Sequence, residues 1–292
     1  MIHFSKYIWL YVLISAFVLV PGIMSLVLFG LRPSIDFTGG TLLEVTSSAD
    51  VTAPAIESIA RSQKLEVVDA RQDQSILVRM KPAPPENVTR FEKDVRVLAS
   101  DSATILRMES VGPVLGNELL IKAGIASGIA ILGILLFVAY TFRNVTFGIS
   151  AVVALIHDVL VVFGSFSLLG HFWGIEVDTL FVTAFLTTMS FSVHDTIVVF
   201  DRIREYEKRG ERLTFSERCD LALTETMGRS VTNSLTICFM LLALVLLGGE
   251  TIRWFAVALL IGTISGTYSS PFVATPVLIF LSSFKRSKSG SR

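Results

Sequence analysis

The sequence contains few of the residues on which catalytic and metal sites depend. It has two cysteines and four histidines among 292 residues, only 17% of its residues are charged, and its formal net charge is zero. A chain without net charge has no electrostatic preference for nucleic acid or another polyanion. Cys219 lies in a charged stretch and Cys238 in an apolar one, so we predict neither a disulfide nor a cysteine-based metal site.

Motifs of known hydrolytic chemistry are also missing. No hydrophobic segment contains His-Glu-x-x-His, which would bind zinc, and no Gly-x-Ser-x-Gly turn presents a nucleophilic serine. Two His-Asp pairs could in principle meet as metal ligands, but no nucleophile accompanies them. The sequence therefore disfavours an intramembrane hydrolase, and we expect a protein that is not an enzyme and has no metal or organic cofactor.

Hydrophobic residues are abundant, at 52% of the chain, with a mean hydropathy of +0.65. They gather in runs of about 20 residues, the length at which a helix crosses a bilayer. The first run is longer than a signal-peptide core and lacks a small-x-small cleavage site, which favours an uncleaved helix. We predict six transmembrane helices, at residues 8–31, 119–140, 145–169, 177–200, 231–247 and 252–281.

Basic residues in the short connections predict the orientation. The loop 201–229, between the fourth and fifth predicted helices, carries seven Lys and Arg residues, and the tail 282–292 carries four. Arg143 lies in the turn between the second and third helices, and the turn on the opposite side, 170–176, has no basic residue. Both termini are therefore predicted to be cytoplasmic, and the polar segment 32–118 extracytoplasmic.

The loop 201–229 also contains a helix start. Thr214-x-x-Glu217 is the pattern of a capping box. It predicts a short helix that ends near Met227 and lies along the membrane surface through its apolar side. A solvated connector is the alternative.

The segment 32–118 is predicted to be one small α+β domain. The alternation of apolar and polar residues, with Pro85 opening a helix, predicts the order βαββαβ of a ferredoxin-like sandwich. The predicted strands are 35–46, 65–70, 75–80 and 104–109, and the predicted helices are 53–61 and 85–99. The segment has no cysteine, histidine or glycine-rich phosphate loop, so we interpret it as a binding or docking module.

Ionisable residues occur inside the predicted spans, where each costs several kcal/mol unless it meets water or a partner. The third helix contains His157-Asp158, the fourth His194-Asp195, and the fifth begins at Arg229. A carboxylate that changes protonation in a low dielectric needs hydroxyl groups and a cation nearby. We predict that Asp195 and Arg229 form a proton pathway; a buried ion pair that merely orients helices is the alternative.

Polar residues on the fourth helix fall into two rows. Thr183, Thr187, Ser190 and His194 form one row, and Thr188, Ser192 and Asp195 form a second row about 100° away. On the fifth helix, Asn233 and Thr236 lie on the same face as Arg229. The predicted supporting residues of the proton pathway are His194, His157, Asp158, Thr188 and Ser192.

Small residues predict close helix packing. They recur as Gly124-x-x-x-Gly128 and as Gly262-x-x-x-Gly266-x-x-x-Ser270. Such spacings are common in membrane helices and indicate packing rather than a particular function.

Five strings in the same order resemble one family over nearly the whole chain. They are 35-IDFTGG-40, 111-VGPVLGNEL-119, 154-ALIHD-158, 195-DTIVVFDRIRE-205 and 223-LTETMGRS-230. These strings resemble SecF, the smaller membrane subunit of the bacterial SecD–SecF protein-translocation complex and a relative of the resistance-nodulation-division transporters. The string that begins at Asp195 is the most specific.

The resemblance implies a role in protein export at the bacterial inner membrane. SecD, the SecYEG channel and the translocating preprotein are the implied partners, with YajC and YidC as further ones. The proton-motive force is the implied energy source, with H+ as the expected coupling ion and Na+ as the alternative. The family's helix-4 acid and helix-5 arginine correspond to Asp195 and Arg229. The family usually has Asn where this chain has His194, which can itself bind a proton.

Two other functions are compatible with the residues. One is half of a small-molecule exporter of the resistance-nodulation-division class, although such exporters usually carry twelve spans in one chain. The other is an assembly factor that stabilises the translocation channel by contact alone. In the second case, neutralising Asp195 or Arg229 would have no effect.

Overall fold

The computed structural model describes residues 4–46, 51–72, 75–99, 103–142, 144–209 and 213–289. Arg143 and residues 210–212, which contributed to the predicted orientation, lie outside the described residues, as do residues 290–292 of the basic tail. The chain divides into two compact units, Met1–Arg32 with Ala126–Arg292 and Pro33–Ile125.

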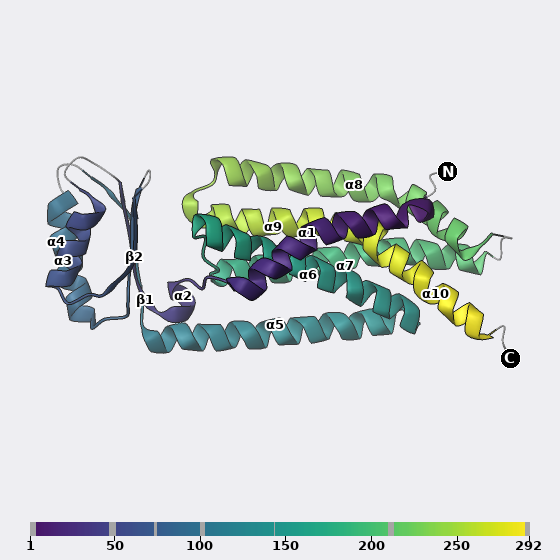
Figure 1. The fold of residues 1–292 in the computed structure, drawn as a ribbon, viewed down its shortest axis with the longest axis horizontal. Helices are drawn as coiled ribbons and strands as arrows, with labels where there is room; N and C mark the ends of the chain where they lie inside the picture. Colours follow the sequence, from purple (N-terminus) through teal and green to yellow (C-terminus); the bar gives the residue numbers. More distant parts are fainter. Residues whose placement is uncertain are drawn as a thin grey trace. The chain divides into compact units, whose positions relative to one another are not determined.

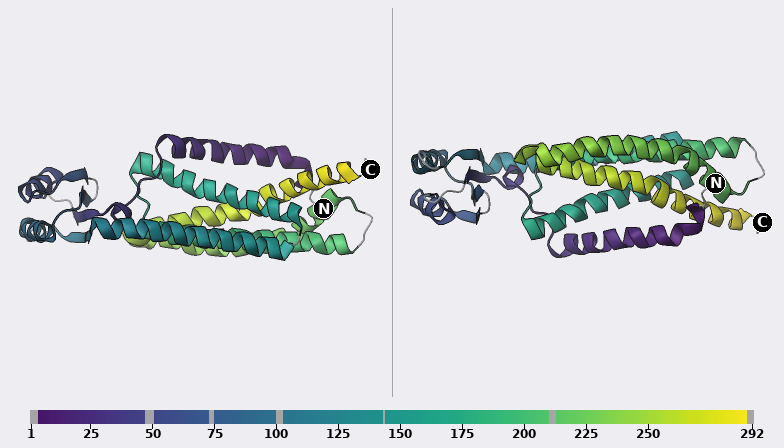
Figure 2. Two further views of the ribbon diagram at one scale, coloured as in Figure 1. Left: turned by 90° about the horizontal axis from the view of Figure 1, so that it is seen from below. Right: turned by 90° about the horizontal axis from the view of Figure 1, so that it is seen from above.

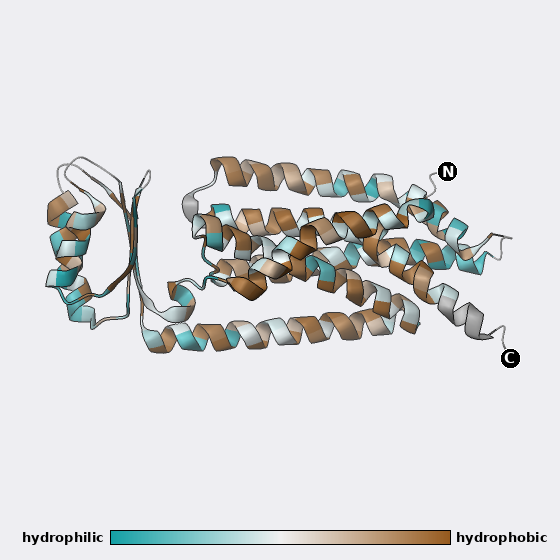
Figure 3. Ribbon diagram, viewed as in Figure 1, coloured by the Kyte–Doolittle hydropathy of each residue, from teal (hydrophilic) through white to brown (hydrophobic). Residues whose placement is uncertain are grey.

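Among the residues that the structure describes, six helices are long and apolar enough to cross a membrane, as predicted, and the chain is a multi-pass membrane protein. Hydrophobic residues dominate these helices (Figure 3). The helices are α1 (Ile8–Leu28, preceded by the 3-10 turn η1, Phe4–Tyr7), α5 (Pro113–Phe142), α6 (Val145–Trp173), α7 (Thr179–Lys208), α8 (Phe215–Leu247) and α9 (Glu250–Ser269), which continues through η2 (Ser270–Ala274) into α10 (Thr275–Ser289).

Short polar side chains start three of these helices. The Asn144 side chain accepts a hydrogen bond from the Thr146 amide at the start of α6, and the Asp178 side chain accepts one from the Phe181 amide at the start of α7. The predicted capping box is present, because Thr214 accepts from the Glu217 amide while Glu217 accepts from the Thr214 amide.

The short surface helix predicted before Met227 is wrong as a separate element. α8 is one continuous helix from Phe215 to Leu247, and α7 extends to Lys208. Most of the predicted loop 201–229 is therefore helical. Cys219, Ala222 and Leu223 are buried, so the first turns of α8 pack against protein and not along a membrane surface. These contacts favour one continuous helix from Phe215 into the apolar part of α8.

The last span contains one irregular turn. η2 is a π-helical turn that includes Pro271. Proline has no amide hydrogen to donate, and the Thr275 hydroxyl donates to the Ser270 carbonyl at 3.2 Å. Turns of this kind inside helices are frequent at functional sites.

The unit Pro33–Ile125 contains the predicted βαββαβ fold. Its elements are β1 (Gly40–Thr46), α3 (Ala53–Ser62), β2 (Val67–Gln72), β3 (Ser75–Met80), α4 (Pro85–Ala99) and β4 (Ile105–Val111). The sheet has the order β2-β3-β1-β4 with every neighbouring pair antiparallel, which confirms the ferredoxin-like arrangement. α3 and α4 cover one face of this sheet (Figure 1), and the core between them includes Leu43, Val78 and Phe91.

The first predicted strand begins later than expected. Residues Ile35–Thr38 form a helical turn, α2, because the Ser34 side chain accepts from the Asp36 amide at its start. The strand begins at Gly40, whose φ is +133°, and a Cβ at this position would lie 2.5 Å from the Met80 carbonyl oxygen. Only glycine fits this entry into the sheet without strain.

The first and last described helices, α1 and α10, begin and end at the same end of the helical unit. The start of α1, the end of α7, the start of α8 and the end of α10 lie together there (Figures 1 and 2). This arrangement agrees with an even number of membrane crossings between the termini.

Candidate ion-coupling site in the helix bundle

Two glycines bring α9 into close contact with α7. A Cβ at Gly262 would lie 2.4 Å from Thr188 Cγ2, and a Cβ at Gly266 would lie 3.1 Å from Ser192 Cα. Without side chains at these positions the two backbones can approach closely. α9 therefore lies against the row that contains Thr188, Ser192 and Asp195.

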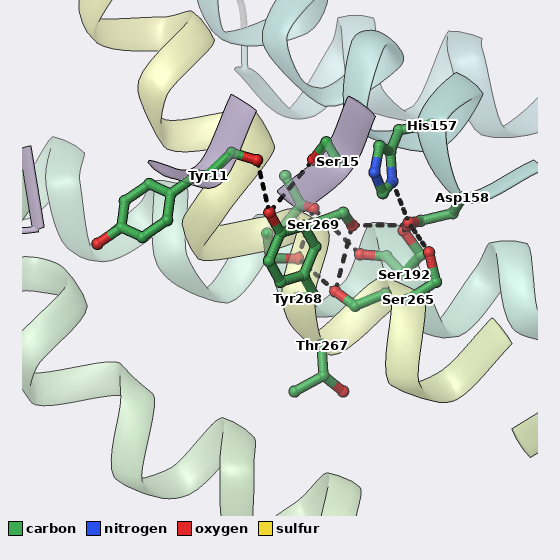
Figure 4. Close-up of polar contacts among 12 residues, drawn as sticks. Tyr11, Ser15, His157, Asp158, Ser192, Ser265, Thr267, Tyr268 and Ser269 are labelled. Atoms are coloured by element: carbon green, nitrogen blue, oxygen red, sulfur yellow. Dashed lines mark hydrogen bonds and ion pairs between the residues drawn. The ribbon is translucent and has the colours of Figure 1, made fainter. Parts of the chain in front are cut away.

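Asp158 is the centre of a buried polar cluster formed by α6, α7 and α9 (Figure 4). Its Oδ2 accepts hydrogen bonds from the hydroxyls of Ser192 at 2.5 Å and Ser269 at 2.6 Å. Its Oδ1 accepts from the Ser265 hydroxyl at 2.6 Å and lies 3.0 Å from His157 Nδ1. The residue is 4% exposed.

The cluster supplies hydroxyl donors to both oxygens of the Asp158 carboxyl group. A serine hydroxyl has one proton to donate, and the three serines direct theirs at Asp158. Ser192 belongs to the predicted set, whereas Ser265 and Ser269 were missed. Their four-residue spacing beside the predicted glycine motif was the available signal, because it places both hydroxyls on one face of α9.

Asp195 has a different environment, although it is also buried at 7% exposure. Its Oδ1 accepts from the Ser230 hydroxyl at 2.6 Å, and its Oδ2 has no hydrogen-bond partner among the described residues. Ser270, which is hydrogen-bonded to Thr196 at 2.8 Å, is close enough to interact with the carboxylate. Both oxygens of Asp158 therefore accept hydroxyl hydrogen bonds, whereas only one oxygen of Asp195 does so within the described residues.

Arg229 and Asp195, the two residues of the predicted proton pathway, are not in ion-pair contact in the described structure. Arg229 is exposed. Within the described residues, no nitrogen of its side chain lies within 4.0 Å of an Asp195 carboxylate oxygen. The hydrogen bond from α8 to the Asp195 carboxylate is made by Ser230, the next residue along the chain. Elsewhere along the same pair of helices, Arg202 and Tyr206 of α7 donate to Glu225 of α8. Arg229 and His194, which is also exposed, are close enough to act electrostatically on the Asp195 carboxylate.

The first polar row of α7 is exposed, and so is the polar row of α8. The exposed residues are Thr183, Thr187, Ser190 and His194 on α7, and Arg229, Asn233 and Thr236 on α8. Thr188 on α7 and Ser234 on α8 instead face α9, the latter through a hydrogen bond with Thr267. Helical spacing therefore places both exposed rows on the side of the α7–α8 pair that is turned away from α9. We call these seven residues the α7–α8 polar face.

Sequence comparisons match the chain to protein-export families. The family described as protein export membrane protein SecD/SecF, C-terminal, matches residues 91–283, and the SecD/SecF GG motif matches residues 25–51. The protein translocase subunit SecF of Thermobaculum terrenum is 40% identical over 99% of this chain and 98% of its own length. The SecF of Anaerolinea thermophila is 39% identical over 93% of this chain and 91% of its own length.

Solved structures agree with these matches. A crystal structure of SecDF, a translocon-associated membrane protein from Thermus thermophilus, covers 97% of this chain with a TM-score of 0.84 and 32% identity. A super-membrane-facing form of SecDF covers 98% of it with a TM-score of 0.62 and 29% identity. This chain spans 39% of each of those longer chains.

Proposed function

Because the chain belongs to the SecD/SecF family of protein-export membrane proteins, we propose that it couples the proton-motive force to protein export together with SecD. Family membership makes it a SecF-type accessory subunit of Sec protein export. Its relatives are protein-translocase subunits, which favours this function over that of a small-molecule exporter. Beyond family membership, we propose the step that couples proton movement to export and the residues that perform it.

The contrast between the two buried carboxylates supports Asp195 as the proton carrier. Asp158 receives three hydroxyl donors, whereas Asp195 receives one, and its buried Oδ2 has no hydrogen-bond partner among the described residues. A proton that binds Asp195 Oδ2 removes the charge on which Arg229 acts and weakens the charge-assisted bond from Ser230. α7 and α8 can then shift relative to each other around Asp195, while Arg202 and Tyr206 of α7 stay bonded to Glu225 of α8. Proton release to the cytoplasm restores the starting state.

The energy available to this step is limited. One charge that crosses the membrane potential contributes about 2.3 kcal/mol per 100 mV. A change of that size biases a two-state equilibrium without fully committing it. The coupling therefore requires a mobile element whose two states already have similar free energies, and we assign this role to the hydrogen bond between Ser230 and Asp195.

The α7–α8 polar face supports SecD as the partner within the membrane. Polar side chains on a spanning helix are unfavourable against lipid and favourable against another helix. The Thermus thermophilus SecDF is 34% identical over 90% of this chain, which corresponds to only 36% of its length, so a SecD part is joined to a chain of this kind there. SecD helices that cover His194 and Arg229 would also seal the surroundings of Asp195 from lipid.

The remaining parts of the proposal follow from family membership and from the distribution of charge. We place the protein in the bacterial inner membrane with both termini cytoplasmic, because the basic residues collect at that end. SecYEG, YajC, YidC and the translocating preprotein are the other proposed partners. H+ is the proposed coupling ion, and Na+ is an outcome that the experiment below can identify.

The test is export of a secreted preprotein in membrane vesicles that contain SecD with this chain. The wild type is expected to lose its stimulation of export when a protonophore collapses the gradient. Asp195→Asn is expected to lack that gradient-dependent stimulation from the start. Asp201→Asn is the matched control, because Asp201 lies on the same helix with its side chain 60% exposed, and it should export like the wild type.

Each result separates the competing functions. If Asp195→Asn keeps full gradient-dependent stimulation, the carrier role of Asp195 is wrong. If stimulation survives a protonophore but requires a sodium gradient, the ion is Na+. If export needs the chain but no gradient, the protein is an assembly factor. His194→Asn measures how the residue at the family's usual Asn position changes the ion dependence.

A further inference from the structure

We infer that Ser269 and Ser270, which lie where α9 passes into η2, are positioning residues that link the Asp195 site to the Asp158 cluster. The link contains a contact that opens and closes, because the hydrogen bond between Ser270 and Thr196 of α7 breaks and re-forms in each export cycle. The link rests on the function proposed above, since its residues act through Asp195.

The two serines reach both acid sites from one point on the chain. The Ser269 hydroxyl donates to Asp158 Oδ2 at 2.6 Å (Figure 4). Ser270 Oγ lies 2.8 Å from the hydroxyl of Thr196, which directly follows Asp195 on α7. Ser270 is also close enough to interact with the Asp195 carboxylate. Because the two serines are consecutive, a shift of this point on α9 that changes one contact also changes the other.

The contact between α7 and η2 can open without leaving an unpaired hydroxyl. The Ser270 hydroxyl also lies 3.2 Å from the Gly266 carbonyl oxygen of its own helix. The Thr196 hydroxyl likewise lies 3.1 Å from the Ser192 carbonyl oxygen of its own helix. A hydroxyl has one proton to donate, so each can donate to its own helix when the two part. The free-energy cost of an unsatisfied buried polar group is therefore avoided.

The π-helical turn makes this part of the chain easier to change than a regular helix. Pro271, the second residue of η2, has no amide hydrogen. The ladder of backbone hydrogen bonds is therefore interrupted directly after Ser270, whose carbonyl accepts from the Thr275 hydroxyl at 3.2 Å. Ser270 thus lies at a joint between two regular helices, α9 and α10, and not inside one of them.

Burial separates these hydroxyls from lipid and from bulk water. Ser269 and Ser270 are 0% exposed, and Thr196 is 1% exposed. One turn before the serines, a Cβ at Gly266 would lie 3.1 Å from Ser192 Cα, so α9 lies directly against α7 there. The hydrogen bond at Ser270 is therefore made between packed elements, and its opening requires α7 and η2 to move apart.

The experiment is a reversible disulfide lock in the complex with SecD, in membrane vesicles. Thr196→Cys combined with Ser270→Cys puts sulfur atoms where the two oxygens lie 2.8 Å apart, a separation that a small adjustment turns into a disulfide. The chain's own Cys219 and Cys238 are replaced by Ala. We expect oxidation of this variant to abolish gradient-driven export, and reduction to restore it at least in part.

Ser25→Cys combined with Ser167→Cys is the matched control. These two buried hydroxyl oxygens also lie 2.8 Å apart, but they join α1 to α6. The two helices are in close backbone contact beside this pair, since a Cβ at Gly164 would lie 2.7 Å from Gly22 Cα. The pair takes no part in the link, so its disulfide should form and leave gradient-driven export unchanged.

Thr196→Val and Thr196→Ser test the same contact without a cross-link. Valine keeps the shape of threonine and removes the hydroxyl, whereas serine keeps the hydroxyl. We expect Thr196→Val to lower gradient-driven export by roughly two- to tenfold, the factor that corresponds to one hydrogen bond, with gradient-independent export unchanged. Thr196→Ser should export near the wild-type rate, and an equal loss in both variants would contradict a role for the hydroxyl.

The outcomes separate the link from the carrier role of Asp195. The link is wrong if the oxidised Thr196→Cys, Ser270→Cys variant exports like its reduced form, or if it forms no disulfide while the control pair does. If Asp195→Asn keeps gradient-driven export and the disulfide still abolishes it, the carrier role fails and the moving contact stands. If Asp195→Asn loses gradient-driven export while the disulfide and Thr196→Val have no effect, the carrier role stands and the link fails.

Discussion

The packing of α9 against α7 predicts a strong effect of adding one methyl group at Gly262. An alanine Cβ there would lie 2.4 Å from Thr188 Cγ2, whereas carbon atoms pack best at about 3.5–4.0 Å. Gly262→Ala must therefore displace the helices or the Thr188 side chain by about 1 Å or more. Thr188 has little freedom to move, because it is 4% exposed and its hydroxyl donates to the Phe185 carbonyl at 2.9 Å.

The cost follows from these contacts. Overpacking a tight interface costs about 1–3 kcal/mol, and losing the Thr188 hydrogen bond adds about 1 kcal/mol. We expect Gly262→Ala to lower the free energy of unfolding by about 2–4 kcal/mol. On the scale of a globular domain of 150–250 residues, this corresponds to a melting temperature lower by roughly 4–16 °C.

Gly148→Ala is the matched control. Gly148 lies in α6, and a Cβ at this position would meet nothing within 4 Å. Alanine is the better helix former by about 1 kcal/mol, so this variant should be as stable as the wild type or more stable.

The assay is thermal unfolding of the purified SecD complex in detergent, followed by intrinsic fluorescence, with gradient-driven export measured in parallel. Gly262→Ala should melt well below Gly148→Ala and should export less, because it separates Ser192 on α7 from the Asp158 cluster. Equal melting temperatures for the two variants would refute the close contact between α9 and α7.

Two further substitutions test single hydrogen bonds. Ser230→Ala removes the only donor to Asp195 Oδ1 among the described residues, and since a hydrogen bond to a charged group contributes about 1.5–3 kcal/mol, we expect gradient-driven export to fall roughly tenfold or more. Ser234→Ala, one turn further along α8, should leave export near the wild-type rate, and an equal loss in both would show that the effect is not specific to Asp195. Asp220, 1% exposed, accepts from the amide of Ser5 at 2.9 Å and from its hydroxyl at 2.8 Å; Asp220→Ala should release the start of the chain, seen as faster proteolysis near Ser5, and unchanged cleavage would contradict this anchor.

The spans and the small domain were predictable because their signals are local. A run of about 20 apolar residues has one stable state in a bilayer, and the six predicted spans agree with the structure. The alternation of residues in β3 and the proline that opens α4 likewise depend only on neighbours along the chain. The predicted surface helix failed because its continuation into α8 depends on buried contacts of Cys219 and Leu223, which no local pattern reveals.

The choice of partners for the buried acids was decided by tertiary structure. The sequence singled out Asp158 and Asp195 as acids in apolar surroundings, since an acid in a span is unusual whatever surrounds it. It did not reveal that Asp158 binds hydroxyls of α9 more than 100 residues away, or that Ser230 rather than Arg229 bonds to Asp195.

The rotation of each helix about its own axis explains why the sequence could identify the acids but not their partners. Residues one position apart on a helix point about 100° away from each other, so the rotation of α8 about its axis decides whether Arg229 or Ser230 meets the Asp195 carboxylate. That rotation is set by packing between helices, where Gly262 and Gly266 allow α9 to approach α7. By itself the sequence determined which residues cannot face lipid; the packed bundle decided which of them meet each other and which are left on the α7–α8 polar face for a partner.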